Sequence, residues 1–259
     1  MRLLESQYRE SLAAVTERLF DLADLVTGWR VLDIGTGAGD TALIAAECVG
    51  PSGFVLATDA SETTIEGLAL RLRSLPEPFP IATAPVAMES LALESGSFDV
   101  ALARNSVMYF TEPQRALGNV RAALRTGGRF VASVYGPIER DPFHAVPVAA
   151  VRRRCEIREP LPEYVQAFRV GADEIERALI AAGFRDVQRH VVPTHRTFPS
   201  LPEAMEALRF SGSLARLLAV LPPEHREDAW ADIASGFRKH LSETGLRLPG
   251  EQFVLVGMA

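Results

Sequence analysis

Hydrophobic and polar positions in the first half of the chain follow two alternating patterns. Short apolar runs typical of buried strands recur along it, at residues 30–34, 54–58, 81–86, 98–103 and 129–135. Several segments between them carry apolar residues at the spacing of one helical face, which predicts helices over 39–49, 62–73 and 111–125. Strands that alternate with helices in this way form a parallel sheet with helices on both faces. We therefore predict an α/β fold built on a Rossmann-like, doubly wound sheet.

The second half of the chain returns to this pattern only in part. It adds a helix over 172–182 and two strands, over 184–192 and 251–258, which complete a predicted seven-stranded sheet. An amphipathic segment over 2–26 predicts one or two helices before the first strand. The remaining segments are mostly helical in pattern and predict a lid beside the sheet. The predicted sheet domain comprises 1–136, 171–198 and 251–259, and the predicted helical lid comprises 137–170 and 199–250.

The composition fits a soluble globular protein and excludes several other classes. With 259 residues, 47% of them hydrophobic, the chain is long enough to bury a full core. A net charge of −6 argues against a nucleic-acid-binding face, and no apolar run approaches the roughly 20 residues of a membrane span. The charged, amphipathic start is unlike a signal peptide. Cys48 and Cys155 form neither a disulfide framework nor a metal-ligand pattern, so we expect a cytoplasmic protein without a metal.

A glycine-rich turn follows the first predicted strand. Asp33 stands near the end of that strand, and Gly35, Gly37 and Gly39 follow it in the sequence DIGTGAG. Glycines there permit positive φ angles and let a ligand approach the main chain beside a helix N-terminus. A dinucleotide-binding turn has G-x-G-x-x-G spacing, and here Asp40 stands in place of its third glycine. Because the Asp33 carboxylate would also oppose a phosphate, the turn favours a cofactor with a cationic end.

A second carboxylate, Asp59, ends the next predicted strand, about 20 residues after the turn. An acid in this place can accept hydrogen bonds from ribose hydroxyls. Dinucleotides and cofactors with a cationic end both use such an acid. Asp59 therefore indicates a ribose without choosing between the two classes.

The order of several short motifs resembles that of class I S-adenosylmethionine-dependent methyltransferases. DIGTGAG and ATDAS match the first two motifs of that family, and SFDVAL and RTGGRF follow in order. The resemblance covers about residues 10–136, and the group it points to includes the ubiquinone and menaquinone C-methyltransferases and many natural-product methyltransferases. It implies an enzyme that binds S-adenosylmethionine, releases S-adenosylhomocysteine and methylates an oxygen, carbon or nitrogen atom of a small, partly apolar acceptor. We expect a role in bacterial secondary metabolism, with the lid binding the acceptor.

The same resemblance implies which residues bind the cofactor. They are Asp33, Gly35, Thr36, Gly37 and Gly39 along the methionine part, Asp59 at the ribose, Ala60, Ala87 and Met88 near the adenine, and Arg104 and Asn105 at the methionyl end. One position departs from the family's pattern, because Ala87 replaces the acid that often accepts a hydrogen bond from the adenine amino group. The loss of one hydrogen bond of about 1 kcal/mol weakens affinity several-fold without abolishing it.

Candidate catalytic residues are few. Methyl transfer from a sulfonium is an in-line displacement, in which the protein mainly aligns the reactants and excludes water. A general base helps when the acceptor is a hydroxyl or an acidic carbon, and the candidates are His144, after the fifth strand, and His195, after the sixth. The alternative for each is an ordinary lid or surface histidine. Tyr8 and Tyr109 are candidates for the acceptor pocket, although a structural role is the alternative for both.

Two other functions stay open at this point. One is a protein that binds S-adenosylmethionine but transfers no methyl group, and uses the sulfonium as a fixed charge in a cyclisation or rearrangement. The presence of Ala87 in place of an acid and the lack of an obvious base favour this function. The other is a nicotinamide-dependent oxidoreductase, which also binds its cofactor at a glycine-rich turn after the first strand. The glycine spacing and the absence of a Tyr-x-x-x-Lys pair count against it. The expected partner is a small-molecule acceptor, with no nucleic acid and no membrane insertion, and a homodimer is left open.

Overall fold

The computed structural model describes the main chain of residues 2–156 and 163–259, and the side chains of 10–156 and 165–259. The first half of the chain contains α1 (Arg2–Ala23), β1 (Arg30–Ile34), α2 (Asp40–Val49), β2 (Phe54–Asp59), α3 (Glu62–Arg73), β3 (Ile81–Pro85), η1 (Met88–Ser90), β4 (Phe98–Arg104), η2 (Val107–Tyr109), α4 (Pro113–Ala123) and β5 (Leu124–Tyr135). The second half contains η3 (Ile138–Arg140), α5 (Pro142–Arg152), α6 (Glu163–Gln166), α7 (Ala172–Ala181), β6 (Arg185–Phe198), α8 (Leu201–Arg209), α9 (Gly212–Ala219), α10 (Pro223–Phe237), η4 (Arg238–His240), β7 (Leu241–Ser242) and β8 (Gly245–Met258). The described chain is thus a mixed α/β structure, as the sequence predicts.

Seven strands form one sheet in the order β3-β2-β1-β4-β5-β8-β6, and the short strand β7 pairs with β8 outside that path. The first five strands are parallel: Leu32 of β1, for example, lies opposite Leu56 of β2 and Ala101 of β4. The strand order reverses direction between β1 and β4, with β2 on one side of β1 and β4 on the other. The carboxyl ends of β1, β2 and β4 therefore meet at one edge, where doubly wound folds bind ligands.

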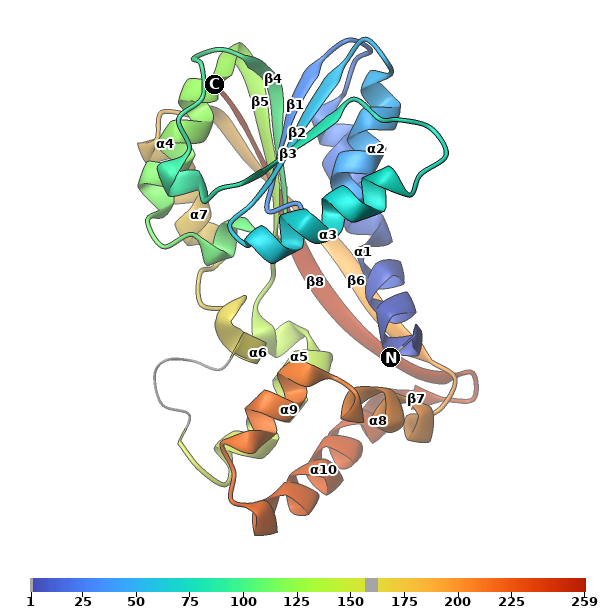
Figure 1. The fold of residues 1–259 in the computed structure, drawn as a ribbon. Helices are drawn as coiled ribbons and strands as arrows, with labels where there is room; N and C mark the ends of the chain where they lie inside the picture. The colour runs from blue at the N-terminus through green and yellow to red at the C-terminus, as the bar shows by residue number, and fades with distance from the viewer. Residues whose placement is uncertain (1, 157–162) are drawn as a thin grey trace. The chain divides into compact units, whose positions relative to one another are not determined.

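The chain divides into two compact units, which we describe separately. The sheet unit comprises Thr16–Val134, Ala172–His190 and Phe253–Ala259, and the helical unit comprises Met1–Val15, Tyr135–Gly171 and Val191–Gln252. In the sheet unit, α4 and α7 cover one face of the sheet, and α2 and α3 lie on the other (Figure 1). Strands β6 and β8 begin in one unit and end in the other.

The helical unit has a hydrophobic core of its own. Its buried members come from α5, α8, α9, α10 and β8 and include Phe143, Leu208, Leu217, Ile233 and Leu248. The apolar segments 143–151 and 213–221, which the sequence offers as lining for an acceptor, contribute much of this core. Burial of apolar area against neighbouring helices accounts for them without a bound molecule.

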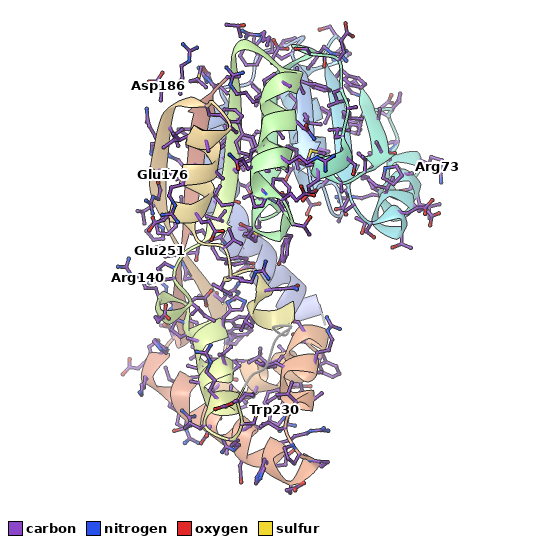
Figure 2. The ribbon with its side chains drawn as sticks, turned by 90° about the vertical axis from the view of Figure 1, so that its left-hand side faces the viewer. Arg73, Arg140, Glu176, Asp186, Trp230 and Glu251 are labelled. Atoms are coloured by element: carbon purple, nitrogen blue, oxygen red, sulfur yellow. The ribbon has the colours of Figure 1, made fainter. Side chains whose placement is uncertain are left out.

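Ion pairs at the surface of the helical unit connect its elements. Arg140 of η3 donates to both carboxylate oxygens of Glu251 of β8, at 3.0 and 2.9 Å, and both residues are labelled in Figure 2. The main-chain nitrogen of Gly136 also donates to the Glu251 main-chain oxygen, at 2.9 Å. These bonds attach the segment before α5 to β8, so the start of α5 has a fixed position within this unit.

Several element boundaries differ from those predicted. Strand β6 extends to Phe198 instead of ending at 192, and β8 begins at Gly245 instead of 251. The extra residues, such as 193–197, are mostly polar and form no apolar run. They belong to the strands because their main chains pair with a neighbouring strand. Helix α4 ends at Ala123, and β5 begins at once with Leu124, whose backbone is already extended. The division into units also differs from the predicted domains. Residues 1–15 and 191–198 belong to the helical unit, whereas the sequence pattern groups them with the sheet.

Among the helices of the described residues, none combines the length and the apolar character needed to span a bilayer.

Candidate active site

The turn after β1 leaves its main chain open to a ligand. Gly35 and Gly37 have positive φ angles of 66° and 55°, which glycine adopts without steric cost. A β-carbon at Gly35 would lie 2.3 Å from the β-carbon of Ser106, so the close approach of these two loops requires glycine. At Gly37 a β-carbon would meet no atom within 4 Å. Gly35 is therefore needed for packing, and Gly37 faces open space beside the start of α2.

Asp59 stabilises this turn from the end of β2. Its Oδ2 atom accepts a hydrogen bond from the Gly37 main-chain nitrogen at 3.1 Å, and its Oδ1 atom accepts one from Ser61 at 3.0 Å. Ser61 in turn caps α3, because its Oγ atom accepts from the Thr64 nitrogen. The acid expected at a ribose is therefore held in place by main-chain donors on two sides.

A cavity of about 420 Å³ lies at the carboxyl ends of these strands. It is lined by Ile34, Gly35, Thr58, Asp59, Ala60, Val86, Ala87, Met88, Glu89, Asn105, Ser106, Tyr109, Phe110 and Thr111. Seven residues singled out from the sequence are among them, namely Gly35, Asp59, Ala60, Ala87, Met88, Asn105 and Tyr109. Among the predicted cofactor-binding residues, Asp33, Thr36, Gly37, Gly39 and Arg104 are not in the lining. The cavity volume suits a nucleoside-sized ligand.

Asp33 lies behind the cavity lining, in β1, and is 1% exposed. Its Oδ2 atom has no hydrogen-bond partner among the described residues. Burial raises the pKa of the Asp33 carboxyl to about 6, although Thr36 and Arg104 act in the opposite direction. A buried carboxylate with a missing partner is costly unless a positive charge approaches it. The residues present therefore fit a cationic ligand.

Arg104 contacts polar groups of α1 and α2. Its guanidinium donates to Thr16 Oγ1 at 2.9 Å and lies 3.9 Å from the Asp40 carboxylate. Arg71 donates to the same Asp40 at 2.6 Å and to the Ala38 main-chain oxygen. Together these cations neutralise Asp40 at the first turn of α2. Arg104 is not in the cavity lining, and its charge also lowers the pKa of Asp33, so its placement at the ligand stays a prediction.

The sequence reasoning missed several lining residues in the segment that follows β4. Glu89 accepts hydrogen bonds from the Thr111 nitrogen, the Thr111 hydroxyl and the Glu112 nitrogen, at 2.8 to 3.3 Å. These bonds join η1 to the segment after η2 and bring Phe110 and Thr111 to the cavity. Tyr109, for which a structural role was the alternative, is 51% exposed. No local pattern in the sequence links Glu89 to Thr111, because the contact spans 22 positions.

The candidate bases lie in the helical unit. The Nδ1 atom of His144 lies 2.7 Å from the Asp141 carboxylate, and Asp141 also lies 3.4 Å from the Arg196 guanidinium. Burial lowers the pKa of His144 against the opposing effect of Asp141. Donation from Nδ1–H to Asp141 leaves Nε2 as the acceptor nitrogen, which is the form of a general base. His195 is exposed on β6, inside the strand and not after it, and the side chain of Tyr8 lies outside the described residues.

The comparisons with known proteins find methyltransferases among the relatives of this chain. A family profile described as a methyltransferase domain matches residues 31–128. Nocamycin O-methyltransferase from Saccharothrix syringae is 27% identical over 241 residues, covering 87% of this chain and 84% of that protein. Ribosomal RNA large subunit methyltransferase E from Syntrophobacter fumaroxidans is 33% identical over 168 residues, covering 56% of this chain and 77% of that protein. The YcgJ protein of Bacillus subtilis has a similar fold, with a TM-score of 0.60 and 18% identity over 96% of this chain and 98% of that chain.

The nicotinamide alternative is set aside by these relatives, because they and the profile are named as methyltransferases. The buried Asp33 carboxylate, the Asp59 acid and the open turn at Gly37 fit an adenosine carrying a sulfonium and an ammonium. The chain belongs to the class I S-adenosylmethionine-dependent methyltransferases, and S-adenosylmethionine is its cofactor.

Proposed function

We propose that this enzyme transfers the methyl group of S-adenosylmethionine to an oxygen atom of a small, partly apolar molecule. The observation that carries the cofactor half is the buried Asp33 carboxylate, whose Oδ2 atom has no partner among the described residues. The next two residues, Ile34 and Gly35, line a cavity of nucleoside size. The choice of oxygen is supported by nocamycin O-methyltransferase, which aligns with 87% of the chain and therefore with segments of both units. The matches to C-methyltransferases are shorter and cover 47 to 69% of the chain.

The residues around the cavity would bind distinct parts of the cofactor. Asp59 would accept from the ribose hydroxyls, and Met88 and Ala60 would pack near the adenine. Asp33 would stabilise the positive charge of the methionyl end. The Gly37 main chain, which carries no side chain to block access, would lie along the ligand. Each assignment is a prediction, and the lining of the cavity supports those at Asp59, Met88 and Ala60.

The bound cofactor supplies a methyl group already activated by the positive sulfur. In the transfer, a bond forms between the acceptor oxygen and the methyl carbon while the bond from that carbon to sulfur breaks. The acceptor also loses its proton, and we predict that His144 receives it through Nε2. Asp141 would hold the imidazole in the required tautomer, since it accepts from Nδ1 at 2.7 Å. A base of this kind contributes about 10²- to 10⁴-fold to the rate.

The test is release of S-adenosylhomocysteine from S-adenosylmethionine in the presence of a panel of phenols, enols and carboxylic acids. We expect one class of oxygen acceptor to produce stoichiometric S-adenosylhomocysteine and a product with a new methyl ether or ester. Methylation of carbon or nitrogen instead would contradict the choice of oxygen. A matched pair of variants, His144→Gln and His195→Gln, asks which histidine acts, and we expect only the first to lower the rate and change its pH dependence.

The alternative is a member of this fold that binds S-adenosylmethionine without using the methyl group. Ala87 favours it, because it lines the cavity where the family often has an acid. The same assay separates the two functions. Turnover of an acceptor without any S-adenosylhomocysteine would support the alternative.

A further inference from the structure

Gln252, in β8, carries a buried hydrogen-bond acceptor that the protein itself does not satisfy. The residue belongs to the helical unit and is 2% exposed. Its Oε1 atom has no hydrogen-bond partner among the described residues. A buried polar atom without a partner costs free energy, which a bound molecule offsets when it supplies the missing partner. Because an amide oxygen only accepts hydrogen bonds, that molecule must bring an O–H or N–H group.

The alternation of side chains along β8 places Gln252 on the same face of the sheet as Gly250. The burial pattern agrees with this, since the buried Leu248 and Gln252 alternate with more exposed residues. A β-carbon at Gly250 would lie 2.6 Å from Thr194 Oγ1 and 3.7 Å from Asp141 Oδ2. The Asp141 carboxylate therefore packs on this face of β8, and Gln252 follows about 7 Å further along the strand.

The Asp141 carboxylate brings the candidate base to the same face. The Nδ1 atom of His144 lies 2.7 Å from Asp141 Oδ2, the oxygen atom that faces β8. The imidazole ring also packs against Tyr135 and Phe168, with 5.7 and 4.9 Å between ring centroids. Both of these aromatic residues are half-buried. The unsatisfied amide oxygen, the base and two partly accessible aromatic rings thus lie in one part of the helical unit.

These groups together suit an aromatic acceptor with two hydroxyl groups. One hydroxyl oxygen would be methylated and give its proton to His144, so it is not available as a lasting donor to Gln252. A second hydroxyl can donate to Gln252 Oε1 throughout the reaction. Half-buried aromatic side chains offer ring faces and edges against which an aromatic acceptor packs.

We propose that Gln252 is a specificity-determining residue of the acceptor site, and that the acceptor is a diphenol whose second hydroxyl donates to Gln252 Oε1. The proposal rests on the proposed function, with His144 as the base, and adds the class of acceptor. A phenol with one hydroxyl leaves the buried oxygen unsatisfied and is therefore the poorer substrate.

The experiment compares catechol, resorcinol and phenol by the release of S-adenosylhomocysteine at saturating S-adenosylmethionine. We expect one of the two diphenols to have a kcat/KM about tenfold above that of phenol in the wild type. Gln252→Leu, which is apolar and of similar size, should abolish this preference and keep the value for phenol within about twofold. Gln252→Glu retains acceptor oxygens and should retain the preference. Gln166→Leu is the control, because it changes an exposed glutamine of the same unit, and it should leave all three values unchanged.

Urea unfolding without ligands separates recognition from a structural role. Gln252→Leu removes a buried atom that has no partner, so we expect a urea midpoint equal to or above that of the wild type. A lower midpoint would show that the protein itself satisfies the amide, and it would overturn the proposal.

Three kinetic outcomes would also overturn the proposal. They are equal kcat/KM values for the diphenols and phenol in the wild type, an equal loss for all three acceptors in Gln252→Leu, and methylation confined to acceptors other than phenols. A failure of the proposed function gives a different result, because the wild type would then methylate no acceptor of any class.

Discussion

One buried polar cluster of the helical unit is fully paired, whereas two buried polar atoms of the sheet unit lack a partner. In the helical unit, the buried Asp141 is paired with His144 and Arg196, and Arg196 also lies over the ring of Phe143 at 4.2 Å. In the sheet unit, Asp33 Oδ2 and Asn105 Nδ2 are buried without a partner among the described residues. Folding alone selects for paired groups, because an unpaired buried group costs free energy. The unpaired set therefore indicates a ligand, and the paired set is complete as the protein stands.

The largest effect is expected from breaking the paired set. Asp141→Ala leaves the Arg196 guanidinium, itself 6% exposed, as an uncompensated buried charge. We expect a loss of about 3 to 5 kcal/mol in the free energy of unfolding, measured with urea. The control is Asp232→Ala in the same unit, which removes the surface pairs with Arg153 and Arg154. That change should cost about 1 kcal/mol or less. Similar losses in the free energy of unfolding for both variants would contradict the expectation that the buried ion pair contributes more to stability than the surface pairs.

The unpaired set should respond in the opposite direction. The pKa of Asp33 in the folded protein, about 6, lies above the ordinary value of 3.8, so its ionisation opposes folding as the pH rises between them. Asp33→Asn removes this penalty. The variant should therefore be more stable than the wild type at pH 8, by up to about 3 kcal/mol, with a smaller difference near pH 4.5.

Urea unfolding of Asp33→Asn and the wild type at the two pH values checks this sign. The same variant should bind S-adenosylmethionine more weakly, because it lacks the carboxylate that we propose stabilises the positive charge of the cofactor. Calorimetry should also detect proton release when the wild type binds the cofactor near pH 6, since a nearby cation lowers the pKa of Asp33. A stability difference that does not change with pH would contradict the unpaired state of this carboxylate.

A third variant weakens the cofactor site without altering its stability to this degree. Asp59→Asn keeps the side-chain shape but replaces the carboxylate that accepts hydrogen bonds from the Gly37 and Ser61 nitrogens. The same carboxylate is predicted to accept from the ribose hydroxyls. We expect the affinity for S-adenosylmethionine to fall about 10- to 100-fold. Asp99→Asn is the matched control, because Asp99 is not in the cavity lining. Its carboxylate accepts from the Arg30 main-chain nitrogen and pairs with the Arg125 guanidinium. The affinity of this control variant for S-adenosylmethionine should be unchanged.

The smallest effect is a gain of affinity. Ala87→Asp introduces the acid that the family resemblance leads one to expect opposite the adenine amino group, in a residue that lines the cavity. One added hydrogen bond of about 1 kcal/mol corresponds to about fivefold tighter binding. Ala82→Asp, on the exposed side of β3, is the control and should change nothing. A loss of affinity in Ala87→Asp would show that the purine lies elsewhere.

The sequence predicted the sheet unit better than the helical unit, for a physical reason. Buried parallel strands are short apolar runs, and glycine turns and helix caps such as Ser61 are local signals. The long strands β6 and β8 depend on pairing between distant segments, and their polar residues carry no apolar pattern. The apolar helices of the helical unit were correctly predicted as helices. The periodicity of their apolar residues does not distinguish residues that pack against a neighbouring helix from residues that line a pocket.

The same distinction holds at the site. The Gly35 turn, Asp59 and Asn105 are recognisable because each directly follows or ends a strand, and the carboxyl ends of parallel strands converge. Glu89 and its bonds to Thr111 could not be predicted, nor could the pairing of Arg104 with Asp40 and Thr16. These contacts depend on loop geometry and on side chains that meet across tens of positions.

The sequence by itself determined the family and the cofactor, and it predicts which edge of the sheet binds that cofactor, because strand order and glycine positions are encoded locally. Only the tertiary structure decided which polar groups are satisfied. It shows that Asp33 Oδ2 and Asn105 Nδ2 are buried without a hydrogen-bond partner among the described residues. It also shows that Arg104 donates to Thr16 and that His144 is held by Asp141. Hydrogen-bond satisfaction is a property of atoms brought together in space, and residue identity alone does not specify it.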